Sequence, residues 1–215
     1  CRFASTIRDG PDSGSPSINR RCLALFAIVV EHKMTMSNLI SITPADSSQI
    51  SQTWRFSIPE APYAFVAGLI SDSISSLTPT TGDSSVIRIE STGNTPLAIQ
   101  QLCEWLSSYF RGNPLPTPFR LSPFGTAFQQ RVWNALVKVP LGATASYRDI
   151  AERIGQPHAY RAVGNAIGCN PIFILIPCHR IVQSSGKTGG FRWGSEIKEQ
   201  LLSLEQTGQT PGSAA

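Results

Sequence analysis

A cysteine, a histidine and an arginine follow one another at residues 178–180, directly after Pro177. A thiol is a strong nucleophile only as its thiolate, and a nearby imidazole or guanidinium favours the thiolate. An apolar run at residues 172–176 predicts a buried strand, which Pro177 must end because proline lacks a backbone donor. A small buried cysteine is the alternative, since free cysteines are among the most buried residues. The adjacent imidazole and guanidinium favour a reactive thiol at Cys178.

The cysteines and histidines show no metal-binding pattern. The five cysteines are odd in number and lack C-x-x-C or zinc-finger spacing, and the three histidines are scattered. Such usage is typical of reduced thiols in a cytosol. We therefore expect no metal, no cofactor, and a cytoplasmic protein, or a nuclear one in a eukaryote. The cysteines are Cys1, Cys22, Cys103, Cys169 and Cys178.

The charge of the chain is unevenly distributed. The net charge is +4, with 15% charged and 41% hydrophobic residues. Residues 120–205 carry ten basic and five acidic side chains, whereas residues 49–119 carry three basic and five acidic ones. A basic C-terminal part favours a polyanion as partner, although a mildly basic solvated surface is the simpler explanation of the charge alone.

No apolar stretch reaches the roughly 20 residues of a membrane span, so we expect no membrane association. Residues 22–30 imitate the apolar core of a signal peptide, but no small-residue cleavage site follows before Glu31. The chain does not begin with methionine, and Met34 and Met36 offer alternative starts. We expect residues 1–35 to be an upstream extension without a structural role.

The composition predicts an α/β (α+β) fold in two domains joined by a proline-rich linker. Residues 49–116 are expected to form a small N-terminal domain of a sheet and a helix, and residues 117–207 a mostly helical catalytic domain. Residues 1–48 are expected to be disordered or an upstream extension, and residues 208–215 a flexible tail.

The N-terminal domain carries signals for both strands and a helix. Residues 54–56 and 85–90 alternate as short strands do. Pro96 opens a helical pattern with one apolar face, which consists of Leu102, Trp105, Leu106, Tyr109 and Phe110. The sequence therefore predicts a helix packed on a small sheet.

Two capping boxes start helices in the second domain, at Thr126 and at Ser146. Gly155 ends the second of these helices, and a third helix is predicted at about residues 159–167. Two short helices around a glycine turn are typical of a helix-turn-helix, although ordinary helix packing gives the same pattern. Arg161 lies near the start of the third helix, where DNA-reading residues usually lie.

The second domain resembles a known family. Residues 125–205 are closely similar to the catalytic domain of the O6-alkylguanine-DNA alkyltransferases, also called methylated-DNA–protein-cysteine methyltransferases. The Phe-Arg-Trp-Gly run at residues 191–194 is most similar to the bacterial adaptive-response branch. The first domain resembles the family's N-terminal domain only in size and position. The segments that carry the resemblance are residues 125–133, 146–147, 161–164, 170–171, 177–180 and 190–194.

The resemblance implies DNA repair by direct, irreversible, single-turnover transfer of an alkyl group from O6-alkylguanine, and from O4-alkylthymine, to the protein's own cysteine. Cys178 matches the nucleophile, His179 the water-mediated base, and Glu205 the carboxylate that orients this base. Asn170 matches the residue that ties the recognition helix to the active-site turn. Tyr147 matches the hydroxyl donor to the base ring.

The implied partner is double-stranded DNA containing O6-alkylguanine, bound by a monomer through a winged helix-turn-helix-like element in the minor groove. Arg161 matches the arginine that fills the hole left by an extruded nucleotide. Phe191 stands where a tyrosine is common, so any hydroxyl contact there is lost. The other implied DNA-binding residues are Tyr160, Gly164 and Ser146, and the implied substrate-binding residues are Phe191, Arg192, Trp193 and Ile181.

Two other functions are weighed against this one. A Cys–His hydrolase needs its thiol and imidazole in contact, which adjacent residues do not easily provide, and no oxyanion loop is evident. A damage sensor flips alkylated bases without repairing them, but such relatives lack the cysteine that this chain has at position 178.

Overall fold

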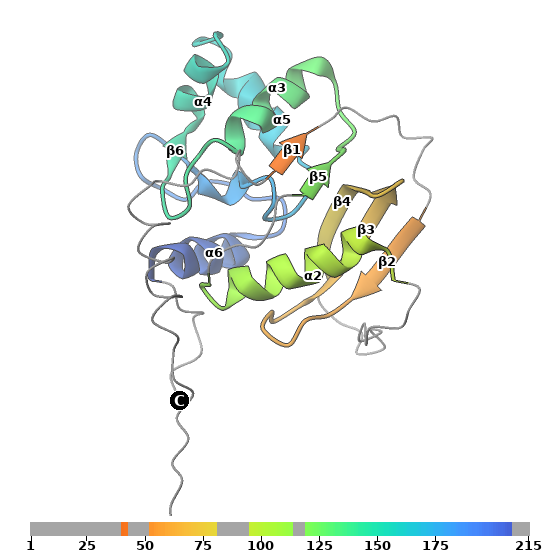
Figure 1. The fold of residues 1–215 in the computed structure, drawn as a ribbon. Coiled ribbons are helices and arrows are strands. Elements are labelled where there is room, and N and C mark those ends of the chain that lie inside the picture. Colours follow the sequence, from red (N-terminus) through yellow and green to blue (C-terminus); the bar gives the residue numbers. More distant parts are fainter. Residues whose placement is uncertain (1–39, 43–51, 81–94, 114–118, 208–215) are drawn as a thin grey trace, which may run out of the picture.

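The computed structural model describes residues 40–42, 52–80, 95–113 and 119–207. A sheet with one long helix across it lies beside a group of shorter helices (Figure 1). None of the described helices is long and apolar enough to cross a membrane. In chain order the elements are β1 (Ile40–Ile42), β2 (Gln52–Phe56), β3 (Ala64–Ile70), β4 (Ser73–Thr80), α2 (Leu97–Phe110), β5 (Phe119–Leu121), α3 (Ala127–Leu136), β6 (Ala145–Ser146), α4 (Tyr147–Arg153), α5 (Tyr160–Gly168), the 3-10 helix η3 (Cys178–Arg180), β7 (Ile181–Val182) and α6 (Ser195–Thr207).

The large sheet has the strand order β1-β5-β4-β3-β2. Strands β2, β3 and β4 run antiparallel, whereas β5 pairs in parallel with β4 and with β1. Strand β5 follows the predicted linker, so the second half of the chain completes the sheet of the first half.

Strand β1 falls within residues 1–48, which the sequence predicted to be disordered or an upstream extension, and disorder is wrong for Ile40–Ile42. A three-residue strand carries too little alternation to be recognised, and its pairing with β5 decides its conformation. The predicted strand at residues 85–90 lies outside the described residues.

Helix α2 packs on this sheet through the apolar face that the sequence predicted, and all five of the named residues are buried. The residues that α2 packs against come from β2 and from the β3–β4 hairpin. The sequence analysis did not identify this hairpin. Phe56 and Phe65 stack with ring centroids 5.5 Å apart, and Tyr63 lies edge-on to Phe110 at 5.9 Å. The hairpin and α2 therefore share one aromatic core.

The predicted capping boxes start α3 and α4. The Thr126 side chain accepts from the Gln129 amide and the Gln129 side chain accepts from the Thr126 amide; the second box repeats this geometry. Gly155, at φ +73°, follows α4 in the left-handed region that favours glycine. Helix α5 begins one residue later than predicted. The helical pair expected from the sequence is confirmed.

The apolar run at residues 172–176 is a buried turn, so the predicted strand was wrong. One isolated bridge joins it to Leu77 of β4, and Ile174 has a φ of 61°. The backbone of Leu77 makes two hydrogen bonds, of 3.0 and 2.9 Å, with this turn and the residue before it. An apolar run indicates burial but not backbone conformation, because a turn between two packed layers needs the same side chains. The large sheet therefore holds one end of the turn that leads to Cys178.

A second, two-stranded sheet joins β6 to β7 in parallel, with Ala145 opposite Ile181 and Ser146 opposite Val182. Strand β6 directly precedes α4, and β7 directly follows η3. This pairing, which no sequence pattern indicated, places the first residue of α4 beside the cysteine–histidine–arginine segment.

Gly125 lies against the indole of Trp133, and this contact provides a test of the fold. A Cβ at Gly125 would lie 2.5 Å from two ring carbons of Trp133. The indole is fully buried, and its Nε1 donates to the Ala166 carbonyl at 2.9 Å, so it cannot move aside without separating α3 from α5. We expect Gly125→Ala to lower the free energy of unfolding in urea by about 1–3 kcal/mol.

The matched control is Gly190→Ala, because a Cβ at Gly190 would meet open space. This variant should change the free energy of unfolding by less than about 0.5 kcal/mol. Equal losses in the two variants would contradict the importance of the indole contact.

Candidate active site

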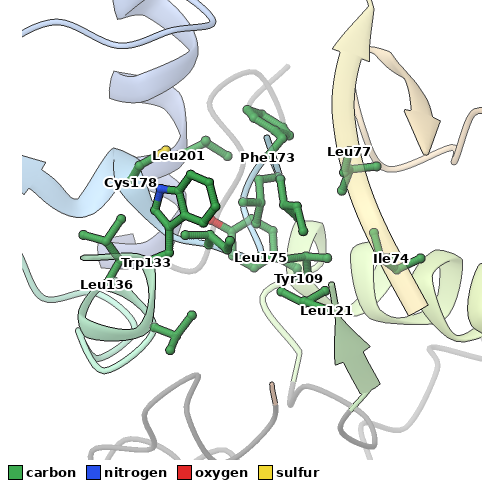
Figure 2. Packing of buried hydrophobic residues seen from close by; sticks show 14 of the residues in the cluster. Ile74, Leu77, Tyr109, Leu121, Trp133, Leu136, Phe173, Leu175, Cys178 and Leu201 are labelled. Atoms are coloured by element: carbon green, nitrogen blue, oxygen red, sulfur yellow. The ribbon is translucent and has the colours of Figure 1, made fainter. Parts of the chain in front are cut away.

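Cys178 opens η3, and the side chain of Asn170 holds the turn that leads to it. The Asn170 Nδ2 donates to the carbonyls of Ile172 and Ile176, at 3.1 and 2.9 Å, and to the Cys178 Sγ at 3.0 Å. Its Oδ1 accepts from the Ile172 amide at 2.9 Å. Both side chains are buried, and Figure 2 draws the cysteine together with the hydrophobic residues of the core. One amide thus connects the end of α5 to the sulfur.

The surroundings of Cys178 keep its thiol protonated at rest. Burial raises the pKa of the thiol to about 11, although the Asn170 hydrogen bond and the positive charges of Lys198 and Arg192 act in the opposite direction. A thiol attacks efficiently only as thiolate. A base must therefore remove the proton before this sulfur can act as a nucleophile.

Glu205, near the end of α6, accepts five hydrogen bonds. Its Oε1 accepts from the His179 Nε2 at 2.7 Å, the Tyr109 hydroxyl at 2.7 Å and the Arg180 Nη2 at 2.8 Å. Its Oε2 accepts from the Arg180 Nε at 2.7 Å and from the Gly142 amide at 3.2 Å. Burial alone would raise the pKa of Glu205, but the Arg180 guanidinium and His179 hold it well below its usual range. The carboxylate is therefore ionised although it is buried.

The fully buried ring of His179 lies against this carboxylate. Since an ionised carboxylate can only accept, Nε2 carries the ring proton and Nδ1 is the basic nitrogen. Nδ1 has no hydrogen-bond partner among the described residues. Burial lowers the pKa of His179, while Glu205 acts to raise it, so the net effect favours a neutral imidazole. Such a ring can accept a proton. We call Cys178, His179 and Glu205 the relay.

Three donors to Glu205 were missed in the sequence. Arg180 was interpreted only as a neighbour of the thiol and Tyr109 as a core residue of the other domain, while Gly142 was given no role in the site. The Arg180 Nη1 also donates to the Val139 carbonyl at 2.7 Å. These donors lie 25, 96 and 63 residues from Glu205 along the chain, and nothing local indicates such contacts.

Lys198 is a further buried residue that the sequence analysis did not single out. Its side chain is fully buried, and its Nζ donates to the Ile181 carbonyl at 2.6 Å and to the Thr188 carbonyl. It therefore joins β7, which directly follows η3, to the loop before α6. The sequence signal was its spacing, because Lys198, Leu201 and Leu204 lie on one face of α6.

The expected substrate-binding residues take different positions. The side chain of Ile181 is fully buried, so only its backbone could meet a ligand. Phe191 and Trp193 are partly buried and pack on each other at 5.3 Å, and Trp193 lies edge-on to Phe173 at 5.0 Å. Arg192 is exposed and lies 5.9 Å over the Trp193 ring. The indole of Trp193 is thus part of an aromatic cluster around the buried turn.

Tyr147, at the start of α4, comes close to the sulfur. Burial, and then the charge of Cys178, raise the pKa of Tyr147, so the hydroxyl lies within electrostatic reach of the thiol. A Cβ on Gly189 would lie 3.3 Å from the Tyr147 hydroxyl, which places the loop glycine directly beside it. The β6–β7 pairing accounts for this position, since it brings the start of α4 to η3.

The expected DNA-binding residues lie on or next to α4 and α5. Tyr160 and Arg161 are exposed at the start of α5, with the guanidinium 5.8 Å over the tyrosine ring. A Cβ on Gly164 would lie 3.7 Å from the Tyr147 ring, so α5 passes beside that ring. The Ser146 hydroxyl accepts from the Asp149 amide at 3.1 Å and is engaged as the cap of α4.

Residues 127–207, which contain α3 to α6, match the family model described as 6-O-methylguanine DNA methyltransferase, DNA binding domain. A methylated-DNA–protein-cysteine methyltransferase of Mycobacterium tuberculosis is 46% identical over 112 residues, which are 52% of this chain and 68% of that protein. The chain belongs to the methylated-DNA–protein-cysteine methyltransferase family. Another methyltransferase of this name, from Methanosarcina barkeri, is 50% identical over 101 residues, which are 47% of this chain and 64% of that protein. The match with the Methanosarcina relative thus spans less than two thirds of its length.

Solved methyltransferase structures share the fold. A crystal structure of Mycobacterium tuberculosis OGT in complex with DNA is 34% identical, has a TM-score of 0.61, and covers 74% of this chain and 94% of that chain. A crystal structure of Mycobacterium tuberculosis O6-methylguanine methyltransferase is 35% identical, with a TM-score of 0.60 and coverages of 75% and 96%. These matches extend well beyond the helical part, and they confirm the expected mixed α/β fold.

Glu205→Gln in this protein would remove the anion that faces the buried Arg180. Removing one partner of a buried ion pair costs about 3–5 kcal/mol, because the other charge stays buried and uncompensated. We therefore expect the free energy of unfolding, measured by urea denaturation at neutral pH, to fall by this amount. Glu199→Gln, an exposed change on the same helix, is the matched control.

The loss should also depend on pH. The pKa of Glu205 is depressed in the folded state, so its stabilisation is present above its ordinary pKa of about 4.3 and is lost as the pH falls below that value. The stability difference between wild type and Glu205→Gln should therefore narrow from about pH 5 to about pH 3. A difference that stays constant over this range would contradict an ionised, buried carboxylate.

Proposed function

We propose that this protein repairs DNA by transferring an alkyl group directly from the O6 of alkylated guanine, and from the O4 of alkylated thymine, to the Sγ of Cys178. The observation that carries the proposal is the relay, in which a buried thiol lies one residue before a neutral imidazole that is hydrogen-bonded to an ionised carboxylate. The family membership of the chain supports the same chemistry. The transfer is irreversible and occurs once per molecule, because the thioether that forms is stable toward every group of the site.

The residues of the relay divide the chemistry between them. The Nδ1 of His179 takes the thiol proton by way of a water molecule, and Glu205 stabilises the imidazolium that results. The thiolate attacks the alkyl carbon, so that a carbon–sulfur bond forms while the bond from this carbon to O6 breaks. The electron pair of the broken bond passes to the guanine, where a hydrogen bond from the Tyr147 hydroxyl stabilises it.

Double-stranded DNA is the proposed partner. Helices α4 and α5 form the helix-turn-helix, and α5 is the element that enters the minor groove. A base inside a duplex cannot reach a buried sulfur, so the nucleotide must be extruded, and the exposed Arg161 fills the space that it leaves. The DNA complex of the Mycobacterium tuberculosis relative supports this partner.

The extruded base is proposed to bind between Tyr147 and the loop that carries Phe191, Arg192 and Trp193. The ring contacts of that loop with Phe173 give it a rigid aromatic base. Ile181 takes part through its backbone, since its side chain is buried. In this proposal residues 117–207 are the catalytic and DNA-binding part, and residues 49–116 support it.

Incubation with duplex DNA containing O6-methylguanine should add about 14 Da to the protein, on the peptide that contains Cys178. Cys178→Ala should abolish this gain while DNA binding persists, because the proposed DNA contacts lie on other elements. Cys169→Ala removes an exposed cysteine on the C-terminal side of α5 and is the matched control, which should still be methylated. Unmodified wild-type protein together with demethylated DNA would indicate hydrolysis and would contradict the proposal.

Arg161→Ala should slow repair of duplex DNA more than repair of single-stranded DNA with the same lesion. Unstacking a base costs a few kcal/mol, and Arg161 is proposed to offset part of this cost by stabilising the extruded state. Without the arginine, repair of duplex DNA should be roughly ten- to a hundredfold slower. Arg153→Ala, which removes an exposed arginine at the end of α4, should affect the two substrates alike. Equal losses on both substrates in Arg161→Ala would contradict the proposed role.

A further inference from the structure

Tyr109 connects the N-terminal sheet and helix to the relay. It lies in α2, 96 residues before Glu205, and its side chain is only 4% exposed. Its hydroxyl donates at 2.7 Å to Oε1 of Glu205, the same oxygen that lies 2.7 Å from the His179 Nε2. Of the five hydrogen bonds described for this carboxylate, the one from Tyr109 comes from the part of the chain before the predicted linker.

The tyrosine is not needed to orient the carboxylate. The Nε and Nη2 of Arg180 form a fork to both oxygens of Glu205, and such a fork already fixes the carboxylate plane. The hydroxyl instead adds a neutral donor on the oxygen that His179 uses. A hydrogen bond donated to an anion stabilises its charge and so weakens its attraction for a neighbouring cation.

We propose that Tyr109 is a positioning residue that acts through Glu205, sharing Oε1 with His179 and so keeping the imidazole neutral until the thiol yields its proton. For its biological meaning this inference rests on the proposed function. It assigns to the part of the chain before the predicted linker a share in the reactivity of Cys178.

The other charged groups around the relay remain in place when the hydroxyl is removed. Arg180 and Lys198 face His179, and Lys198 and Arg192 face Cys178. The side chain of Tyr109 stays protonated as a donor, since burial and then Glu205 raise its pKa well above the usual range. A change in thiol reactivity on loss of this hydroxyl would therefore come through the carboxylate.

The competing explanation is that Glu205 only satisfies a buried hydroxyl. In that case Tyr109→Phe would lower the thermal stability but leave the proton affinity of the relay unchanged. The pH dependence of Cys178 reactivity separates the two explanations, because a purely structural contact does not move it.

The experiment is alkylation of Cys178 by iodoacetamide over a range of pH, followed by mass spectrometry of the peptide that contains it. Without the hydroxyl, Oε1 attracts the imidazolium more strongly, and the thiolate forms at lower pH. The midpoint is the pH at which the alkylation rate of Cys178 is half its maximum. We expect this midpoint to be about half a pH unit lower in Tyr109→Phe, which is roughly a threefold change in the protonation equilibrium. An unchanged midpoint, or one that rises, overturns the inference.

Two further proteins complete the test. Tyr63→Phe removes another buried tyrosine hydroxyl, from the aromatic cluster with Phe110, and should leave the midpoint unchanged. Incorporation of 3,5-difluorotyrosine at position 109 keeps the ring and gives a stronger donor, so the midpoint should rise. This variant decides the question even if Tyr109→Phe does not fold, and a midpoint equal to that of wild type would overturn the inference.

Methyl transfer by wild-type protein is measured in parallel on duplex DNA containing O6-methylguanine. If the wild type takes up no methyl group while the midpoint shifts as expected, the proposed function fails and the role of Tyr109 stands. If methyl transfer occurs but the midpoint does not move, only the role of Tyr109 fails.

Discussion

The buried, ionised carboxylate of Glu205 is the constraint on which the rest of the site depends. Removing an ionised carboxylate from water costs several kcal/mol even after relaxation, and only donors placed around both oxygens can offset that cost. The fold supplies them from α2, the loop after α3 and η3, while the carboxylate itself comes from α6. Segments that are far apart in the sequence must therefore meet at one place.

A second constraint is the turn that precedes Cys178. Its backbone groups are buried away from water, where an unpaired amide or carbonyl is costly. Asn170 pairs with three of them and with the sulfur, and Leu77 of β4 pairs with others. The cysteine is therefore held from both sides, by α5 through the asparagine and by the large sheet through the turn. This explains how Ile174 can be kept at a φ that a β-branched residue rarely adopts.

These two constraints explain how a poor nucleophile and a weak base can work together. Burial keeps the thiol protonated and also favours a neutral imidazole, so neither of these two groups carries a charge at rest. The charge appears only when the proton moves, and the Glu205 carboxylate is already in position to stabilise it. In the proposed transfer the alkyl group stays on the sulfur, so no group of the site has to release it, as a hydrolase would require.

The sequence by itself determined helices α2 to α5, the candidate thiol and the family of this chain. Caps such as Thr126 with Gln129 and the apolar face of α2 are local features, and local hydrogen bonding and periodicity decide them. The thiol of Cys178 was recognised from the residues next to it in the sequence. Tertiary structure alone decided the conformation of residues 172–176, the pairing of β6 with β7, and the meeting of Tyr109, Arg180 and Gly142 at Glu205. The physical reason is that burial of an apolar run does not specify its backbone, and that a hydrogen bond across 96 residues leaves no periodic trace in either partner.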